Sequence, residues 1–247
     1  MRSVQDWIDA YLPLITDRLQ CANAEILAFE KKWPVVIRND HRRFLGLFGG
    51  DTGATRVDFL HITNSSYGVE ALEDYYAECA DFPDMYPPDG WSLFAVSDLG
   101  RSVAVNNLRG SLFEFEDNRL FDFVSSSIDK FLAQRLYSYI NFYSTRDKNR
   151  QLGFYGLRKF TSNDELISFL ESNNFDVIQE LCDHRQIFAQ RGDVYFLSDF
   201  GSPRSHPPNP NHYGDFRFAT PAKDERIIWN LSKELAAILG VAHRIQS

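Results

Sequence analysis

Between Asp58 and Asp98 the chain contains nine aspartates and glutamates and no lysine or arginine. The acids are Asp58, Glu70, Glu73, Asp74, Glu78, Asp81, Asp84, Asp89 and Asp98. The aromatic residues interleaved with them are Tyr67, Tyr75, Tyr76, Phe82, Tyr86 and Trp91. A surface that combines carboxylates with rings can bind a basic protein, because the charge steers the encounter and the rings supply binding hot spots. The alternative is a solvated helix face over core aromatics, since most charge runs serve solubility.

Two histidines offer a second kind of chemistry. His206 and His212 share a proline-rich segment, with Asp199 and Asp215 nearby. Imidazole and carboxylate groups could form a metal site or an acid–base site there. The competing interpretation is a surface loop whose histidines are simply exposed. An enzyme that uses residues 199–215 is therefore a less favoured alternative.

Two further residue pairs have chemical interpretations. Cys182 and His184 could form a nucleophilic dyad, but no third orienting group is recognisable. Glu114 and Glu116 could form a glycosidase-like pair. Period-two patterning explains them better, as the exposed polar face of a strand whose aromatic residues are buried. Nucleotide-binding loops, dinucleotide glycine fingerprints and zinc-protease motifs are absent from the sequence. The sequence thus predicts no catalytic residue, no cofactor and no metal site.

The composition is that of a globular protein with an acidic front half. Of 247 residues, 44% are hydrophobic and 24% are charged, and the formal net charge is −8. Residues 1–120 hold 11 basic and 19 acidic residues, whereas residues 121–247 hold 15 of each. This balance argues against a phosphate backbone as the main ligand. We expect a soluble, cytoplasmic protein, because the cysteines are far apart, the sequence has no signal-peptide pattern, and no apolar run reaches roughly 20 residues.

Hydrophobic periodicity and turn residues predict a mixture of helices and strands. Helices are predicted at residues 4–20, 23–33, 39–48, 69–80, 123–143, 163–170 and 224–239, with 176–181 extending or following the sixth. Strands are predicted at 57–62, 92–96, 102–106 and 112–116, and a hairpin at 187–189 and 194–197. Residues 145–151 form a candidate linker, and residues 82–90 and 201–214 are predicted loops.

Four short motifs follow one another between residues 24 and 134. The first two are ILAFE at 26–30 before Trp33-Pro34, and DHRRFL at 40–45 before Gly49-Gly50. The last two are the strands from Trp91 to Phe115, with Gly110 before LFEF, and VSSSIDKFL at 124–132. In this order they resemble the SUKH superfamily, which includes bacterial immunity proteins against polymorphic toxins and fungal regulators of cell-wall synthesis. The chain departs from that pattern in its long acidic segment, 67–88, and in continuing to residue 247.

The resemblance implies an α+β fold with a mixed or antiparallel central sheet and helices packed on it. It assigns residues 1–145 to a SUKH-like domain with an N-terminal helix. Residues 146–247 are then an α+β C-terminal extension. Whether that extension is an added domain, a second degenerate unit or a structural extension stays open at the level of the sequence.

The resemblance also implies a non-enzymatic function, that of an immunity protein that binds a cognate toxin and blocks its active site or substrate path. We expect a basic toxin, for example a nuclease or a deaminase, and we expect neither nucleic acid nor membrane as a partner. The residues expected to bind the toxin are Glu70, Glu73, Asp74, Tyr75, Glu78 and Trp91. The alternative is a SUKH-like scaffold or regulator that binds an endogenous partner.

Overall fold

The computed structural model divides the chain into two compact units. We call Val4–Leu136 the N-terminal unit, and Tyr137–Ser247 together with Met1–Ser3 the C-terminal unit. The structure describes residues 2–15, 18–33, 35–50, 65–97, 101–143, 150–155, 163–184, 186–199, 215–220 and 226–239. Each unit is described by itself.

The N-terminal unit is an antiparallel sheet with helices on both faces. Its strands are β1 (Ser65–Ser66), β2 (Trp91–Ser97), β3 (Ser102–Asn106), β4 (Leu112–Glu116) and β5 (Arg119–Ser125), and they are neighbours in that order. Its helices are α1 (Val4–Tyr11), α2 (Asn23–Lys32), α3 (Asn39–Phe48), α4 (Val69–Glu78) and α5 (Ile128–Ser138). Short 3₁₀ turns occur at η1 (Leu12–Leu14) and η3 (Pro83–Met85).

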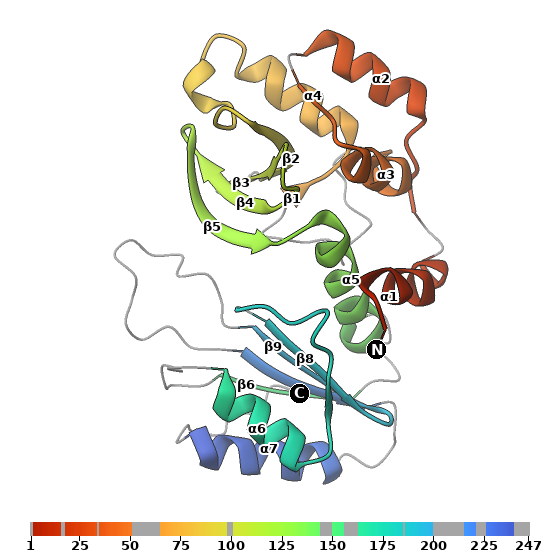
Figure 1. Cartoon of the computed structure of the whole chain (residues 1–247), viewed down its shortest axis with the longest axis vertical. Coiled ribbons are helices and arrows are strands. Elements are labelled where there is room, and N and C mark those ends of the chain that lie inside the picture. The colour runs from red at the N-terminus through yellow and green to blue at the C-terminus, as the bar shows by residue number, and fades with distance from the viewer. Residues whose placement is uncertain are drawn as a thin grey trace. The chain divides into compact units, whose positions relative to one another are not determined.

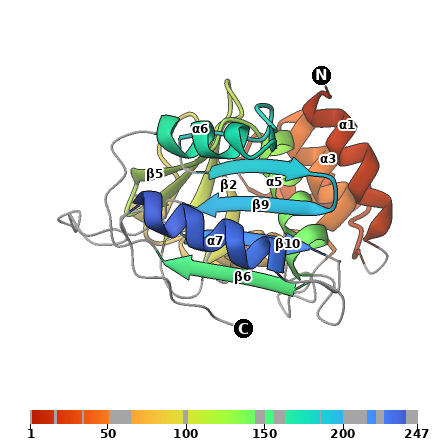
Figure 2. The same ribbon diagram turned by 90° about the horizontal axis from the view of Figure 1, so that it is seen from below.

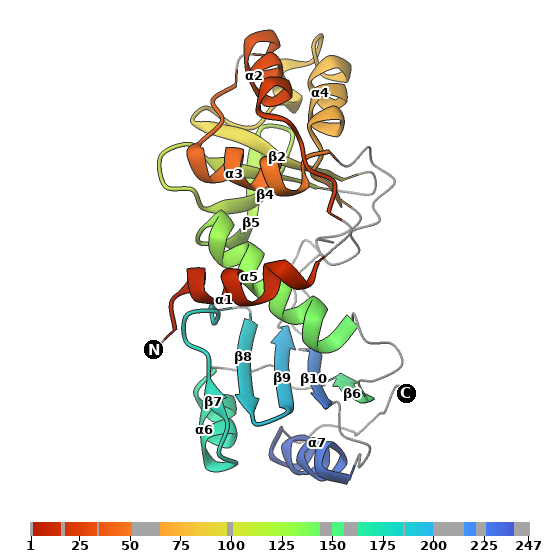
Figure 3. The same ribbon diagram turned by 90° about the vertical axis from the view of Figure 1, so that its right-hand side faces the viewer.

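Two layers of side chains hold this unit together. Helices α2 and α4 cover one face of the sheet, and α5 packs on the other (Figures 1 and 3). The first layer joins Ile26, Phe29, Leu72, Tyr76, Leu93, Ala104 and Phe115. The second is a group of rings in which Phe94 of β2 contacts Phe44 of α3 and Phe131 of α5, at centroid distances of 4.9 and 5.7 Å. These buried rings fix α4 on the sheet, and α4 carries four of the nine acids between Asp58 and Asp98.

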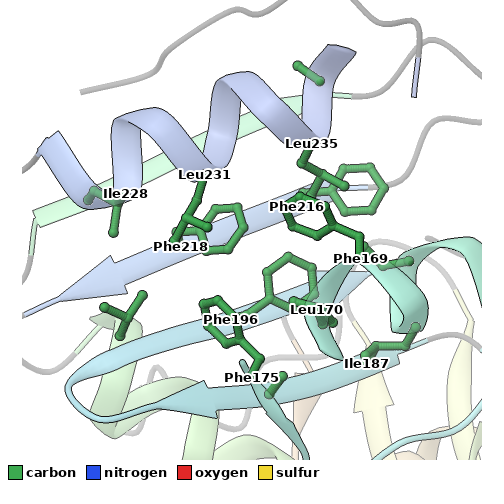
Figure 4. Close-up of a cluster of buried hydrophobic side chains, with 14 residues drawn as sticks. Phe169, Leu170, Phe175, Ile187, Phe196, Phe216, Phe218, Ile228, Leu231 and Leu235 are labelled. Carbon is green, nitrogen blue, oxygen red and sulfur yellow. The ribbon is translucent and has the colours of Figure 1, made fainter. Parts of the chain in front are cut away.

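The C-terminal unit is a second antiparallel sheet. Its strands are β6 (Arg150–Tyr155), β7 (Asp176–Val177), β8 (Gln186–Arg191), β9 (Val194–Asp199) and β10 (Asp215–Thr220), in the spatial order β6-β10-β9-β8-β7. Helices α6 (Asp164–Ser172) and α7 (Arg226–Leu239) lie across one face of it (Figure 2). Leucines of both helices meet the sheet phenylalanines Phe196, Phe216 and Phe218 there (Figure 4).

The other face of the second sheet is covered by residues at the end of α5 and just after it. Tyr137 donates a hydrogen bond of 2.8 Å to the Ala189 carbonyl oxygen, and its ring meets Phe188 edge-on at 5.3 Å. Phe142, in the π-helical turn η4 (Tyr139–Tyr143), is buried against Tyr137. This sheet is therefore packed on both faces within its own unit.

The two units share an order of elements. In each, a helix is followed by four strands in an antiparallel meander and then by a second helix, α4-β2-β3-β4-β5-α5 and α6-β7-β8-β9-β10-α7. They differ in the added strand, because β1 pairs with β2, the first strand of its meander, whereas β6 pairs with β10, the last.

The predicted fold class is confirmed, because both sheets are antiparallel and carry packed helices. The helices predicted at 23–33, 39–48, 69–80 and 224–239, the three strands from residue 92 to 116 and the hairpin are also confirmed. The strand predicted at 57–62 and the loop at 201–214 lie outside the described residues. The predicted domain boundary at residue 145 stays a prediction.

Several local predictions are wrong. The helix predicted from residue 123 begins at Ile128, because Phe123 belongs to β5. The helix predicted from residue 4 ends at Tyr11, since Pro13 cannot continue the helical hydrogen bonding, and 176–181 begins with β7 instead of extending α6. Strands β6 and β10 are missing from the prediction, and the candidate linker ends inside β6.

Candidate protein-binding surface

Helix α4 presents a line of three exposed carboxylates. Its apolar residues Val69, Leu72 and Tyr76 are buried against the sheet. On the outer side, Glu70, Asp74 and Glu78 are all exposed. They follow one another at intervals of four, which places them on one face of the helix. We call these three residues the acidic line.

The carboxylates of the acidic line repel one another along the helix that carries them. Like charges four residues apart destabilise a helix by about 0.2–0.5 kcal/mol per pair. Glu78 lies in the last turn of α4, where the helix dipole disfavours a negative charge, whereas Glu70 lies in the first turn, where the dipole favours one. Helix stability therefore accounts for Glu70 but not for the spacing of all three carboxylates.

Glu73 has a different environment from the acidic line. It is half-buried and forms an ion pair with Lys32 of α2. The Lys32 ammonium also lies 5.3 Å from the centroid of the Trp33 ring. The Glu73 charge is thus already compensated within the unit, so this predicted site residue is less available to a partner than Asp74.

The turn after α4 exposes two apolar side chains. Phe82 is 61% exposed and Met85 is 42% exposed. The backbone N–H of Phe82 donates to the Cys79 carbonyl, and that of Met85 donates to the Phe82 carbonyl, both at 2.9 Å. Asp81 and Asp84, on either side of Phe82, are exposed as well. Neither Phe82 nor Met85 is among the predicted site residues. Their position in the sequence, between acids and prolines, was the signal that could have indicated their exposure.

Tyr75 and Trp91 support this surface from beneath. Both are half-buried and pack on the first core layer. The Tyr75 ring meets Phe115 edge-on at 6.3 Å, and Trp91 meets Phe113 at 5.4 Å. Burial raises the pKa of the Tyr75 phenol, so its hydroxyl stays protonated as a donor. Their placement favours a supporting role over direct contact with a partner.

The structure changes the interpretation of Glu114 and Glu116. Glu116 is exposed as expected, but Glu114 is buried at 9% exposure, so the prediction of an exposed pair is wrong. The cause is that helices cover both faces of this sheet: Glu114 pairs with the fully buried Val103 of β3, on the face opposite Phe115, so that face is not open to solvent. Arg101 lies 4.0 Å from Glu114 and 3.4 Å from Glu116, with its guanidinium 3.7 Å from the Phe121 ring centroid.

The other predicted chemistry finds little support in the described parts of the chain. Cys182 is half-buried, and its sulfur accepts a hydrogen bond from the Phe188 N–H at 3.3 Å, while His184 is exposed. His206 and His212 lie outside the described residues. Among the residues with described positions, no group of three or more His, Cys, Asp or Glu side chains is arranged to hold a metal ion. No described helix has both the length and the apolarity to cross a membrane.

The N-terminal unit is an α+β domain, because it has an antiparallel sheet with helices on both faces. Its exposed acidic helix is a candidate protein-binding surface. Residues 20–134 match the model of the SMI1 / KNR4 family (SUKH-1), so this segment belongs to the SUKH superfamily and the predicted resemblance is confirmed. This superfamily covers immunity proteins and SMI1/KNR4 regulators, which bind partner proteins. No curated protein and no solved structure matches the chain. The match contains α4 and the turn after it, and the C-terminal unit lies beyond it.

Proposed function

We propose that this chain is a non-enzymatic, cytoplasmic immunity protein that binds a cognate bacterial toxin and neutralises it. The carrying observation is the acidic line on α4, which is exposed and has no lysine or arginine near it in sequence from Glu70 to Asp89. The SUKH match supports protein binding as the general activity.

The charge of this surface favours a basic partner. Six carboxylates between residues 70 and 89 are exposed: Glu70, Asp74, Glu78, Asp81, Asp84 and Asp89. Nucleases and deaminases have basic clefts for their polyanionic substrates, and an acidic protein can occupy such a cleft in place of nucleic acid. Electrostatic steering would also speed the encounter, which suits a protein that must reach a toxin before the toxin acts.

The second candidate is a SUKH-like regulator or scaffold with an endogenous partner. The match to the SMI1 / KNR4 model favours this alternative equally, because that family includes regulators. Both candidates use a protein-binding surface. They differ in whether the partner is toxic without the chain.

The first experiment captures the partner with the tagged full chain from lysate of its native host, at low and at high salt, followed by mass spectrometry. The test variant carries Glu70→Gln, Asp74→Asn and Glu78→Gln. The control carries Glu165→Gln, Glu171→Gln and Glu234→Gln, three exposed acids on the helices of the C-terminal unit. We expect one basic protein that is lost at high salt and with the test variant but retained by the control. Equal capture by both variants argues against the acidic line.

The second experiment separates the two candidate functions. The captured protein is expressed in a bacterial host alone and together with the chain. An immunity function requires growth arrest in the first case and rescue in the second, and the acidic-line variant should rescue less than the control. A partner that is harmless when expressed alone would favour the regulator.

A further inference from the structure

We propose that Phe82 and Met85 form the apolar anchor of this surface, and that the partner inserts an apolar side chain flanked by lysines or arginines against them. This proposal rests on the proposed function, because it assigns the contact chemistry of the same surface. It moves the hot spot from Tyr75 and Trp91 to the turn that follows α4.

The exposure of this pair has no explanation in the folding of the unit. Phe82 is 61% exposed and Met85 is 42% exposed, so most of the Phe82 ring contributes nothing to the core. The two residues are separated by three positions across the 3₁₀ turn η3, and residues with that spacing in a 3₁₀ turn lie on the same side. Together they offer one apolar contact.

The turn is held in place before any partner arrives. The Tyr75 hydroxyl donates to the Met85 carbonyl at 2.6 Å, and the Tyr86 hydroxyl donates to the Tyr76 carbonyl at 3.2 Å. The Phe82 N–H bond to Cys79 joins the turn to the end of α4. A rigid anchor loses less conformational entropy on binding, which is the usual advantage of a preorganised hot spot.

The charges around the anchor specify its partner. Glu78, Asp81, Asp84 and Asp89 are exposed and flank the anchor in sequence, with no basic residue among them. An apolar centre with a charged rim is the usual organisation of a protein interface. A partner with an apolar residue between cationic ones complements both parts, whereas an acidic partner is repelled.

Leu108 provides a matched control on the same unit. It is 85% exposed in the β3–β4 turn, and that turn is also rigid, because Arg38 donates to the Asn107 and Leu108 carbonyls at 2.9 Å. Its exposed neighbour is basic Arg109. The two positions thus share exposure and rigidity but differ in the charge around them.

The test uses the full chain and two synthetic peptide probes of identical length and charge. One has a leucine between lysines and arginines, and the other has serine in place of that leucine. We expect the leucine peptide to bind about fivefold tighter or better by NMR titration. The difference should vanish in Phe82→Ser with Met85→Ser and persist in Leu108→Ser. Equal affinities of the two peptides, or loss of the difference in Leu108→Ser alone, would overturn the proposal.

A captured partner adds a second readout. Its dissociation constant should rise about tenfold or more in Phe82→Ser with Met85→Ser, mainly through faster dissociation, and change less than about twofold in Leu108→Ser. If only the acidic-line variant weakens binding, the anchor assignment is overturned and the proposed function stands. If the chain binds the leucine peptide more tightly than the serine peptide but the captured protein is harmless, the anchor assignment stands and the immunity function does not.

Discussion

The hydroxyl of Tyr75 donates a hydrogen bond of 2.6 Å to the carbonyl oxygen of Met85. This bond ties the middle of α4 to the 3₁₀ turn that exposes Met85 and Phe82. The Tyr75 ring packs on Phe115, so the position of the turn is set by the core of the unit. A half-buried aromatic residue thereby positions two exposed apolar ones.

Tyr75→Phe should weaken binding of the partner more than it weakens the fold. The ring and its packing on Phe115 remain, while the Met85 carbonyl loses its donor and the turn becomes mobile. One such hydrogen bond contributes about 0.5–1.5 kcal/mol, so the free energy of unfolding should fall by about that much, measured by urea denaturation. The dissociation constant for the partner should rise several-fold through the entropy of ordering the turn.

The control for that prediction is Tyr76→Phe. Tyr76 lies on the same helix, is buried, and accepts a hydrogen bond of 3.4 Å from the Leu93 N–H. Loss of this hydrogen bond should lower the free energy of unfolding without altering the turn after α4 or the affinity for the partner. If Tyr75→Phe and Tyr76→Phe weaken binding equally, the effect comes from general destabilisation and the Tyr75–Met85 bond has no special role.

Local patterns in the sequence predict much of this fold and fail for identifiable reasons. Helix α3 ends at the predicted Gly49-Gly50 because its apolar residues and its glycines are local signals. Strand β5 is missed because Phe123 and Val124 also fit the helical spacing that continues through Ile128 and Phe131. The Asp117-Asn118 turn before β5, with both φ angles positive, was a usable hairpin signal.

Strands β6 and β10 were missed for a different reason. They pair with each other across the 59 residues that separate Tyr155 from Asp215. Gly153 interrupts β6, and β10 alternates only from Asp215 to Phe218 before Ala219 breaks the pattern. Such pairing depends on contacts far apart in sequence, which local periodicity does not encode.

The sequence likewise predicts only part of the candidate site. The acids Glu70, Asp74 and Glu78 could be predicted because their spacing places them opposite the buried face of α4. The roles of Tyr75 and Phe82 could not, since a ring in an amphipathic sequence is equally compatible with a core and with a contact surface. Only the packing on Phe115 separates a supporting ring from an exposed one.

Gly110→Ala should destabilise the chain more than Gly90→Ala. Both glycines have positive φ, +77° and +81°, so both variants lose about 1–2 kcal/mol from backbone strain. A Cβ at Gly110 would lie 2.9 Å from Nη2 of Arg38 and 3.1 Å from Oδ2 of Asp40, whereas a Cβ at Gly90 meets nothing within 4 Å. The additional loss at Gly110 measures the displacement of the Arg38–Asp40 ion pair, whose Nε–Oδ1 distance is 3.0 Å.

Urea denaturation of the two glycine variants checks this difference. We expect Gly110→Ala to lose about 1 kcal/mol more than Gly90→Ala, because breaking an ion pair that also holds the Leu108 turn costs hydrogen bonds to two carbonyls. Equal losses would mean that Arg38 moves aside at no cost.

His41 should make the free energy of unfolding of the chain depend on pH. It is fully buried on α3, with its ring centroid 5.2 Å from that of Phe94, and neither ring nitrogen has a hydrogen-bond partner within the described structure. Burial lowers its pKa to about 4, with Arg38 and Arg42 acting in the same direction and Asp40 opposing them. The folded chain therefore binds a proton at His41 less readily than the unfolded chain, whose histidine has a pKa near 6.5.

The sign of the effect follows from that difference. The contribution of neutral His41 to stability is fully present above pH 6.5 and is lost as the pH falls toward 4, by about 3 kcal/mol in total. His41→Phe keeps a ring against Phe94 and removes the titrating group. We expect the variant to equal or exceed the wild type in stability at pH 7, and its advantage to grow steadily between pH 6.5 and 4.

The measurement is the free energy of unfolding of wild type, His41→Phe and Phe44→Leu at a series of pH values. Carboxylates also titrate in this range, so the informative quantity is the difference between each variant and the wild type. For Phe44→Leu, which changes a buried, non-titrating side chain that also packs on Phe94, that difference should stay constant with pH. A constant difference for His41→Phe as well would show that the buried imidazole of the folded chain accepts a proton as easily as that of the unfolded chain, which its burial argues against.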